Sequence, residues 1–264
     1  MWQDKNHIKQ IEPEVFVIWK QLGNTPLEEL HRVRNQLGLS DEVKMTYAGR
    51  LDPAAEGELL ILVGESCKRK NEFLGLDKTY MFKVLVGFET DTLDLMGLIV
   101  VGNKTMPRFE GGQLKAVVNK LIGTHSWPYP AYSSRPVDGR PLWQWAREGQ
   151  YQRLLNEDKV PINEFEIKSL HPLGSVQKIS AKELFDYIEA LTNEVAGDFR
   201  QNEVFDSWER AIVASNQQDF QLLEFETRLS SGGYVRQVAQ AIGKKLAFPV
   251  TTFSIARTKI WLEN

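Results

Sequence analysis

Strand-like segments outnumber helical segments along this sequence, and this limits the sheet that the chain can form. The run TYMFKVLVG over Thr79–Gly87 alternates, with Tyr80 on its apolar side and Lys83 on the other. Because strands outnumber helices, we predict an α+β fold with a central mixed or antiparallel sheet flanked by helices. The other predicted strands are Val15–Trp19, Leu59–Val63, Phe165–Leu170, Phe220–Leu229 and Pro249–Leu262.

A capping box predicts the first helix. Thr25 has the side chain of an N-cap, Pro26 suits the first helical position, and Glu28 completes the box. This helix is expected to end near Gly38, and a later helical segment is expected to break at Gly197. The other predicted helical segments are Gly112–Leu121, Trp143–Arg147, Ala181–Ala214 and Tyr234–Lys245.

The composition excludes several classes of protein. Of the 264 residues, 42% are hydrophobic, so the chain can bury a sizeable core and disorder is not expected. Cys67 is the single cysteine, which rules out an internal disulfide and fits a reducing cytoplasm. The polar N-terminus does not resemble a signal peptide, and no apolar stretch is long enough for a membrane span. We therefore expect a cytoplasmic protein, and we expect a monomer.

Residue spacing also excludes several kinds of site. The four histidines are far apart in the sequence, and with one cysteine they provide no zinc signature. The chain has no Walker phosphate loop, no GxGxxG after a strand and no lipase-type nucleophile elbow. We therefore expect neither a bound metal nor a cofactor. The histidines are His7, His31, His125 and His171.

Asp52 lies between Leu51 and Pro53 in the stretch YAGRLDPAAEGELLILVG. Aspartate followed by proline is typical of a helix N-cap, and local sequence favours that interpretation. However, AAEG is short and is stopped by Gly57, and a buried strand is predicted directly afterwards. A carboxylate that is fixed at a strand edge can also serve as the nucleophile of an active site. The sequence alone leaves both interpretations open.

Arg236 lies in the first turn of a predicted helix whose apolar stripe includes Val235, Val238 and Ile242. A cation there opposes the helix dipole by about 0.3–1 kcal/mol at an exposed site. Arg236 is therefore expected either to be solvated or to meet an anion, which is a carboxylate or an RNA phosphate.

Basic side chains gather in short groups although the formal net charge is −3. Surface solvation explains each group separately, whereas several groups on one face would attract a polyanion. The groups that we consider for RNA binding contain Lys68, Arg69 and Lys70 in one segment and Arg135 and Arg140 in another.

Taken together, the motifs resemble the TruB family of RNA pseudouridine synthases. The resemblance runs from about Val15 to Ile260 and rests on two blocks together, Gly-x-Leu-Asp-Pro and the later Gly-x-Tyr-Val-Arg. The matching stretches, in chain order, are AGRLDPAAEGELLILVGESCK, DKTYMFKVLVGFETDTLDLMG, WPYPAYSSRPVDGRPLWQWAREG, SSGGYVRQVAQAIG and FSIARTKI.

The resemblance implies a reaction and a set of roles. Asp52 would be the single catalytic carboxylate that drives cleavage of the uridine glycosidic bond, and Arg236 would pair with it. Tyr80 would stack on the flipped uracil and remove the C5 proton. The reaction is an isomerisation, which needs no cofactor, and the usual target is the T-loop uridine of tRNA. Substrate contacts are expected at Lys20, Tyr47, Arg50, Gly233 and Tyr234.

The sequence departs from the family pattern in places. Tyr47 stands where a histidine is common, and Arg50 stands where threonine or alanine is usual. Residues 1–14 are expected to form an extension and residues 15–264 the catalytic domain, with no C-terminal PUA domain. Three alternatives stay open: a non-catalytic RNA-binding or RNA-folding protein on the same fold, a pseudouridine synthase for another RNA such as ribosomal RNA, and, more distantly, a hydrolase.

Overall fold

The computed structural model describes residues 5, 7–102, 107, 109 and 111–262. Its main feature is a nine-stranded sheet in the order β1-β2-β4-β13-β5-β12-β11-β8, with β3 paired to β4 outside this path. Strands β4 and β13 run parallel, and the other pairs run antiparallel. The strands are β1 (Ile8–Glu12), β2 (Val15–Lys20), β3 (Met45–Ala48), β4 (Ala55–Val63), β5 (Lys78–Val86), β8 (Gly123–Pro128), β11 (Ile162–Ser180), β12 (Asp219–Leu229) and β13 (Val250–Ile260).

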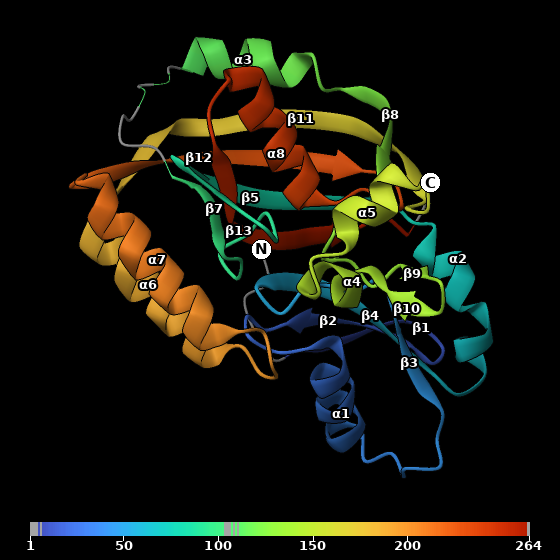
Figure 1. Cartoon of the computed structure of the whole chain (residues 1–264). Coiled ribbons are helices and arrows are strands. Elements are labelled where there is room, and N and C mark those ends of the chain that lie inside the picture. The colour runs from blue at the N-terminus through green and yellow to red at the C-terminus, as the bar shows by residue number, and fades with distance from the viewer. Residues whose placement is uncertain (1–4, 6, 103–106, 108, 110, 263–264) are drawn as a thin grey trace.

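Helices and two small ribbons surround this sheet, which confirms the predicted fold class (Figure 1). Helices α3 and α8 lie together over one face, and α6 and α7 form an antiparallel pair at the side. The helices are α1 (Pro26–Gln36), α2 (Lys70–Leu74), α3 (Gly111–Asn119), α4 (Leu142–Arg147), α5 (Tyr151–Asn156), α6 (Ala181–Glu194), α7 (Gln201–Ser215) and α8 (Val235–Leu246), with the 3-10 helix η1 (Gly64–Arg69) before α2. The ribbons pair β6 (Phe88–Thr90) with β7 (Ile99–Gly102) and β9 (Pro136–Val137) with β10 (Arg140–Pro141).

The apolar periodicities of β5 and α8 meet in the main core. Tyr80 and Phe82 of β5 are buried with Val238 and Ile242 of α8, as the alternation and the helical stripe predicted. Lys83 points to the other, partly exposed face of the sheet. The core therefore lies between the sheet and α8, and it positions the N-terminus of α8 next to the start of β4 and β5.

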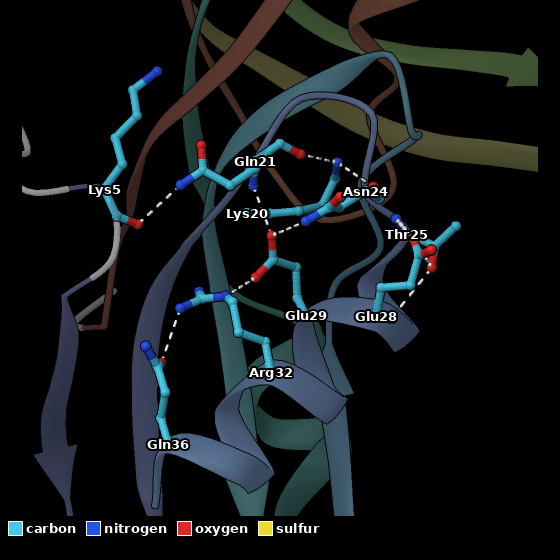
Figure 2. Close-up of polar contacts among 9 residues, drawn as sticks. All are labelled: Lys5, Lys20, Gln21, Asn24, Thr25, Glu28, Glu29, Arg32 and Gln36. Atoms are coloured by element: carbon cyan, nitrogen blue, oxygen red, sulfur yellow. Dashed lines mark hydrogen bonds and ion pairs between the residues drawn. The ribbon is translucent and has the colours of Figure 1, made fainter. Parts of the chain in front are cut away.

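Helix α1 begins as its capping box predicted (Figure 2). The Thr25 amide donates to Glu28 Oε2 at 2.6 Å, and the Glu28 amide donates to Thr25 Oγ1 at 3.2 Å. The helix ends at Gln36, and Gly38 follows with φ +62°. Local sequence alone decides both ends of this helix.

Two expectations need correction, and one predicted strand is longer than expected. No helix follows Asp52, because the Ala55 amide closes a turn on Asp52 O at 3.0 Å and β4 begins at Ala55, so the helix-cap interpretation is wrong. The expected N-terminal extension contains β1, which pairs with β2. The strand predicted at Phe165–Leu170 is part of the 19-residue β11.

None of the described helices has the length and apolar character that crossing a membrane requires.

Candidate active site

Asp52 lies on a turn that is anchored at both ends. Leu51, just before it, is buried in the main core, and Ala55 pairs with Ile255 of β13 just after it. The Gly23 amide donates to Pro53 O at 3.0 Å, which ties the turn to the loop between β2 and α1. The Asp52 side chain itself remains 45% exposed. The fold thus presents a carboxylate to solvent on a fixed backbone.

Arg236 supplies a buried cation for this carboxylate. It is the second residue of α8, after the N-cap Tyr234, and only 3% of its side chain is exposed. Its Nη2 lies 2.9 Å from Asp52 Oδ2, so the anion expected near the helix N-terminus is Asp52. The guanidinium also donates to the carbonyl oxygens of Thr92, at 2.6 Å, and Tyr132, at 3.0 Å. These three acceptors together fix the orientation of the guanidinium.

Asp94 is a second carboxylate at this guanidinium, and the sequence analysis did not find it. Asp94 Oδ2 lies 3.6 Å from Arg236 Nε. Its Oδ1 accepts from Thr92 Oγ1 at 2.6 Å and from the Met96 amide at 3.0 Å. Burial raises the pKa of Asp94 above its ordinary value, and the nearby charge of Asp52 adds to the rise. The Thr-Asp-Thr-x-Asp run after β6 was the available signal.

The two carboxylates also act on Arg236. Burial by itself would lower the pKa of the Arg236 guanidinium, but Asp52 and Asp94 outweigh burial and raise the pKa. Arg236 is therefore a permanent cation that faces a half-exposed carboxylate on one side and a buried one on the other.

The charges of this ion pair act on Tyr234, whereas Tyr80 lies in the apolar core cluster that also contains Leu51 and Ala55. Tyr80, on β5, is 8% exposed and packs in the same cluster as Leu51 and Ala55, which flank Asp52. Tyr234 precedes α8, and burial together with the charge of Asp52 raises its pKa to about 12. Its ring meets that of Tyr129 edge-on at 6.1 Å. Tyr234 therefore keeps its phenolic proton at neutral pH.

Lys20 donates to the Asp52 turn at Pro53, and Figure 2 shows it among the residues of the loop between β2 and α1. Its fully buried ammonium donates to the carbonyl oxygens of Asn24 at 2.6 Å, Gln21 at 2.8 Å and Pro53 at 3.4 Å. Burial lowers its pKa to about 8, although the charges of Glu29 and Asp52 act in the other direction. We expected Lys20 to contact substrate, but the structure places it beneath the turn.

Arg257 supports the residues before Asp52. It is 1% exposed and donates to the carbonyl oxygens of Glu58 at 2.6 Å, Gly49 at 3.0 Å and Arg50 at 3.2 Å. A Cβ on Gly57 would lie 2.3 Å from Arg257 O, so glycine is required where β4 and β13 meet. Burial of an arginine cannot be read from its local sequence.

The remaining predicted substrate contacts lie in different settings. The Arg50 side chain is exposed, next to the Asp52 turn. Tyr47 is on β3, and Lys70 Nζ lies 5.4 Å over its ring. Gly233 packs tightly, since a Cβ there would approach Phe165 Cδ2 to 2.9 Å. The structure explains glycine at this position by packing.

The predicted RNA-binding cations also differ in their surroundings. Lys68 pairs with Glu65. Arg69 pairs with Glu12 at 2.7 Å and with Glu72 at 2.9 Å. Acidic side chains thus already pair with both cations.

Arg135, another cation predicted to bind RNA, is connected to the site by ring contacts. It lies 5.1 Å over the Tyr129 ring, and Tyr129 packs against Tyr234. Arg140 pairs with Glu148 and lies 4.3 Å over Trp145.

Within the described part of the chain, no three His, Cys, Asp or Glu side chains are grouped so that they could hold a metal.

The sequence is similar to a known protein family and to curated proteins. The sequence model for the TruB family pseudouridylate synthase N-terminal domain matches residues 34–182, more than half of the chain. The chain is 29% identical over 249 residues to tRNA pseudouridine synthase B of Aquifex aeolicus, covering 93% of this chain and 67% of that protein. It is 26% identical to the protein of the same name from Caldicellulosiruptor saccharolyticus, covering 93% and 66%.

A solved structure shows the same fold. A chain from a Cbf5-Nop10-Gar1 complex superposes with a TM-score of 0.54 at 13% identity, covering 93% of this chain and 48% of that one. This chain therefore spans about two thirds of the length of the two curated relatives and about half of the solved chain. Since the family model covers more than half of the sequence, the chain belongs to the TruB family of pseudouridylate synthases.

Proposed function

We propose that this protein isomerises uridine to pseudouridine in folded RNA, and that its target is the T-loop uridine of tRNA in the cytoplasm. The observation that carries the proposal is the pair of Asp52 and Arg236, with 2.9 Å between Oδ2 and Nη2. One partner is half-exposed and fixed on a turn, and the other is buried and permanently charged. The family and the names of the two relatives support the choice of reaction and of tRNA.

The proposed reaction moves one bond of the nucleoside. The bond between ribose C1′ and uracil N1 breaks, the base rotates, and C1′ bonds to C5. Asp52 either attacks the ribose or assists formation of a glycal, and Arg236 holds its carboxylate in place. The C5 proton is then removed, N1 gains a proton, and no water is consumed overall. Tyr80 is the proposed base: the family resemblance gives it this role, and it lies in the same core cluster as Leu51 and Ala55, which flank the Asp52 turn.

The uridine must leave its stack to reach Asp52, so binding includes a base-flipping step. Arg135, Tyr129 and Tyr234 form a continuous basic and aromatic surface next to the turn. Aromatic and guanidinium planes are suitable surfaces for an unstacked base or its neighbours. This surface supports RNA as the partner, since a loop with splayed bases presents such planes.

Tritium release tests the proposal. The protein is incubated with a prefolded tRNA transcript labelled at uridine C5, and with a matched transcript whose T-loop uridine is cytidine. We expect release equivalent to one uridine from the first transcript and none from the second. Labelled ribosomal RNA is tested in parallel. Release from ribosomal RNA alone would show that ribosomal RNA, and not tRNA, is the substrate. Stable binding of every RNA without release would favour the non-catalytic RNA-binding alternative.

A further inference from the structure

The connection between β11 and β12 is much longer than the strand pairing needs. The two strands are antiparallel neighbours, and their pairing ends at Ser180 opposite Asp219. A tight turn could join such ends, but residues 181–218 form α6 and α7 instead. Figure 1 shows this hairpin at the side of the sheet, with its tip directed towards β2 and β4. Its position raises the question of what the hairpin contacts.

Helix α7 holds the loop that carries Asp94. The fully buried Trp208 donates from Nε1 to Leu95 O at 3.0 Å and packs edge-on against Phe88 at 5.2 Å. The Ile99 amide donates to Ser207 Oγ at 3.0 Å. Two polar contacts from consecutive residues therefore fix both the middle and the end of this loop.

Arg200, just before α7, adds an ion pair at the start of the same loop. Its Nη1 lies 2.9 Å from Asp91 Oδ2, and this oxygen also accepts from Tyr132 Oη at 2.7 Å. The guanidinium lies 5.0 Å over the Tyr132 ring. Arg200 therefore contacts both Asp91 and Tyr132, which are 41 positions apart in the sequence.

These contacts lead directly to Arg236. The two carbonyl oxygens that accept from Arg236 belong to Thr92, which follows Asp91, and to Tyr132 itself. Leu191 of α6 also lines the small cavity beside Asp52, together with Asp94. The hairpin thus borders the site through both of its helices.

The backbone at the tip is fixed in an unusual conformation. Arg200 has φ +59°, in the left-handed region that non-glycine residues rarely occupy unless their surroundings require it. Gln201 Nε2 donates to Val195 O at 3.1 Å and to Gly197 O at 2.5 Å. Asp198 pairs with Arg147 of α4 at 3.0 Å. The tip is therefore held on several sides, and Arg200 is directed at Asp91.

We propose that Arg200 is a positioning residue, which acts through Asp91 and Tyr132 to hold the two carbonyl oxygens that orient Arg236. The α6–α7 hairpin is then a brace for the site. This inference rests on the proposed function for its effect on rate, whereas its effect on the loop is independent of any reaction.

The test compares Arg200→Met with a control, Arg210→Met. The control removes an exposed arginine from α7, the helix that Arg200 precedes. Hydrogen exchange is measured on both variants and on the unsubstituted protein. We expect amides in residues 91–99 to exchange at least about tenfold faster in Arg200→Met only, because local opening becomes easier there. Unchanged exchange would overturn the proposal, whatever the activity.

Single-turnover tritium release and RNA affinity are then measured on the same variants. Arg200→Met should lose between about tenfold and a hundredfold in rate, because Arg236 is misplaced, with less than about a twofold change in RNA Kd. Arg200→Lys should recover part of the rate, since it keeps the charge but not the planar group. A rate equal to that of Arg210→Met, or an equal loss in affinity and rate, would contradict a positioning role.

Tyr132→Phe provides a milder variant that removes only the hydroxyl donor to Asp91. Its loss in rate should be in the same direction, and its loss combined with Arg200→Met should be smaller than the product of the two. Fully multiplicative losses would show independent roles and overturn the inference. If the unsubstituted protein releases no tritium from any RNA, the proposed function fails, and the exchange measurement still decides whether Arg200 holds the loop.

Discussion

Two buried cations flank Asp52, and their surroundings are opposite. On the α8 side, Arg236 meets the carboxylates of Asp52 and Asp94, and its pKa is raised. On the side of the β2–α1 loop, Lys20 meets three backbone carbonyl oxygens, and its pKa is lowered to about 8. Both lose contact with water, but Arg236 pairs directly with carboxylates that outweigh its burial, whereas the charges of Glu29 and Asp52 do not outweigh the burial of Lys20.

This difference separates two tasks within one turn. A buried cation that faces carboxylates remains charged, and removing it leaves an uncompensated buried charge. A buried lysine that faces neutral dipoles is held by hydrogen bonds but retains a desolvation cost. Arg236 therefore fixes the electrostatics of Asp52, and Lys20 fixes the backbone beneath it. Substitutions on the two sides should consequently fail in different ways.

Replacing Arg236 should have the largest effect. Arg236→Met leaves Asp94 buried without its cation, so we expect a loss of about 3–5 kcal/mol in the free energy of unfolding. Turnover should fall at least about a hundredfold even where the variant is folded. Urea unfolding and tritium release measure the two effects, with Arg210→Met as control. A stable and fully active variant would remove the proposed pairing.

Arg236→Lys makes a narrower change on the same side. Lysine keeps the charge but cannot contact Asp52, Thr92 and Tyr132 in one plane as the guanidinium does. We expect the stability loss to be smaller than for Arg236→Met, while turnover remains strongly reduced. If activity were instead normal, charge alone would be enough and the geometry of the guanidinium would be irrelevant.

The burial of the Lys20 ammonium should make the free energy of unfolding depend on pH. Its pKa is lowered from 10.5 to about 8, so between these values the unfolded chain binds more protons than the folded chain. The cost of burying the cation is fully present below pH 8, and the free energy of unfolding should rise by up to roughly 3 kcal/mol as pH increases to 10.5. Lys20→Met should lose this contribution to the rise.

Urea unfolding from pH 7 to pH 10.5 measures this slope. Lys83→Met, on the partly exposed face of β5, is the matched control and should keep the slope of the unsubstituted protein. A slope that is identical for Lys20→Met and the unsubstituted protein would show that the Lys20 ammonium is not desolvated in solution.

The smallest expected effects concern the cations proposed to bind RNA. Arg135 adjoins Tyr129 and the site, whereas Arg69 is already paired with Glu12 and Glu72. Arg135→Gln should therefore reduce the slope of log Kd against log salt by about 1, as expected when one phosphate contact is lost. Arg69→Gln should reduce it less. Equal slopes for both variants and the unsubstituted protein would show that RNA does not bind at Arg135.

Sequence reasoning succeeded where neighbouring residues decide the structure. The capping box of Thr25 and Glu28 predicted the start of α1, and the alternation around Tyr80 predicted which face of β5 is buried. For the first two features a short-range rule was enough. The unfavourable dipole position of Arg236 left a solvated side chain or a partner anion open, and the structure provides Asp52 as the anion.

It failed where distant segments meet. The Asp52-Pro pair favours a helix N-cap, but pairing of β4 with β2 and β13 overrides that preference. The burial of Lys20 and Arg257 depends on carbonyl oxygens from other segments, which no local pattern reveals. The contact between Arg200 and Asp91 spans more than 100 residues. Tertiary packing therefore decides these sites.

Asp52→Asn gives the most direct test of whether this carboxylate is catalytic. Asparagine keeps the size and the hydrogen-bonding oxygen but removes the charge, so the turn should persist. The measurement is tritium release from one prefolded tRNA labelled at uridine C5, alongside RNA affinity and the free energy of unfolding. We expect no detectable release, with RNA affinity and stability close to those of the unsubstituted protein. Release at the rate of the unsubstituted protein would contradict a catalytic role for Asp52.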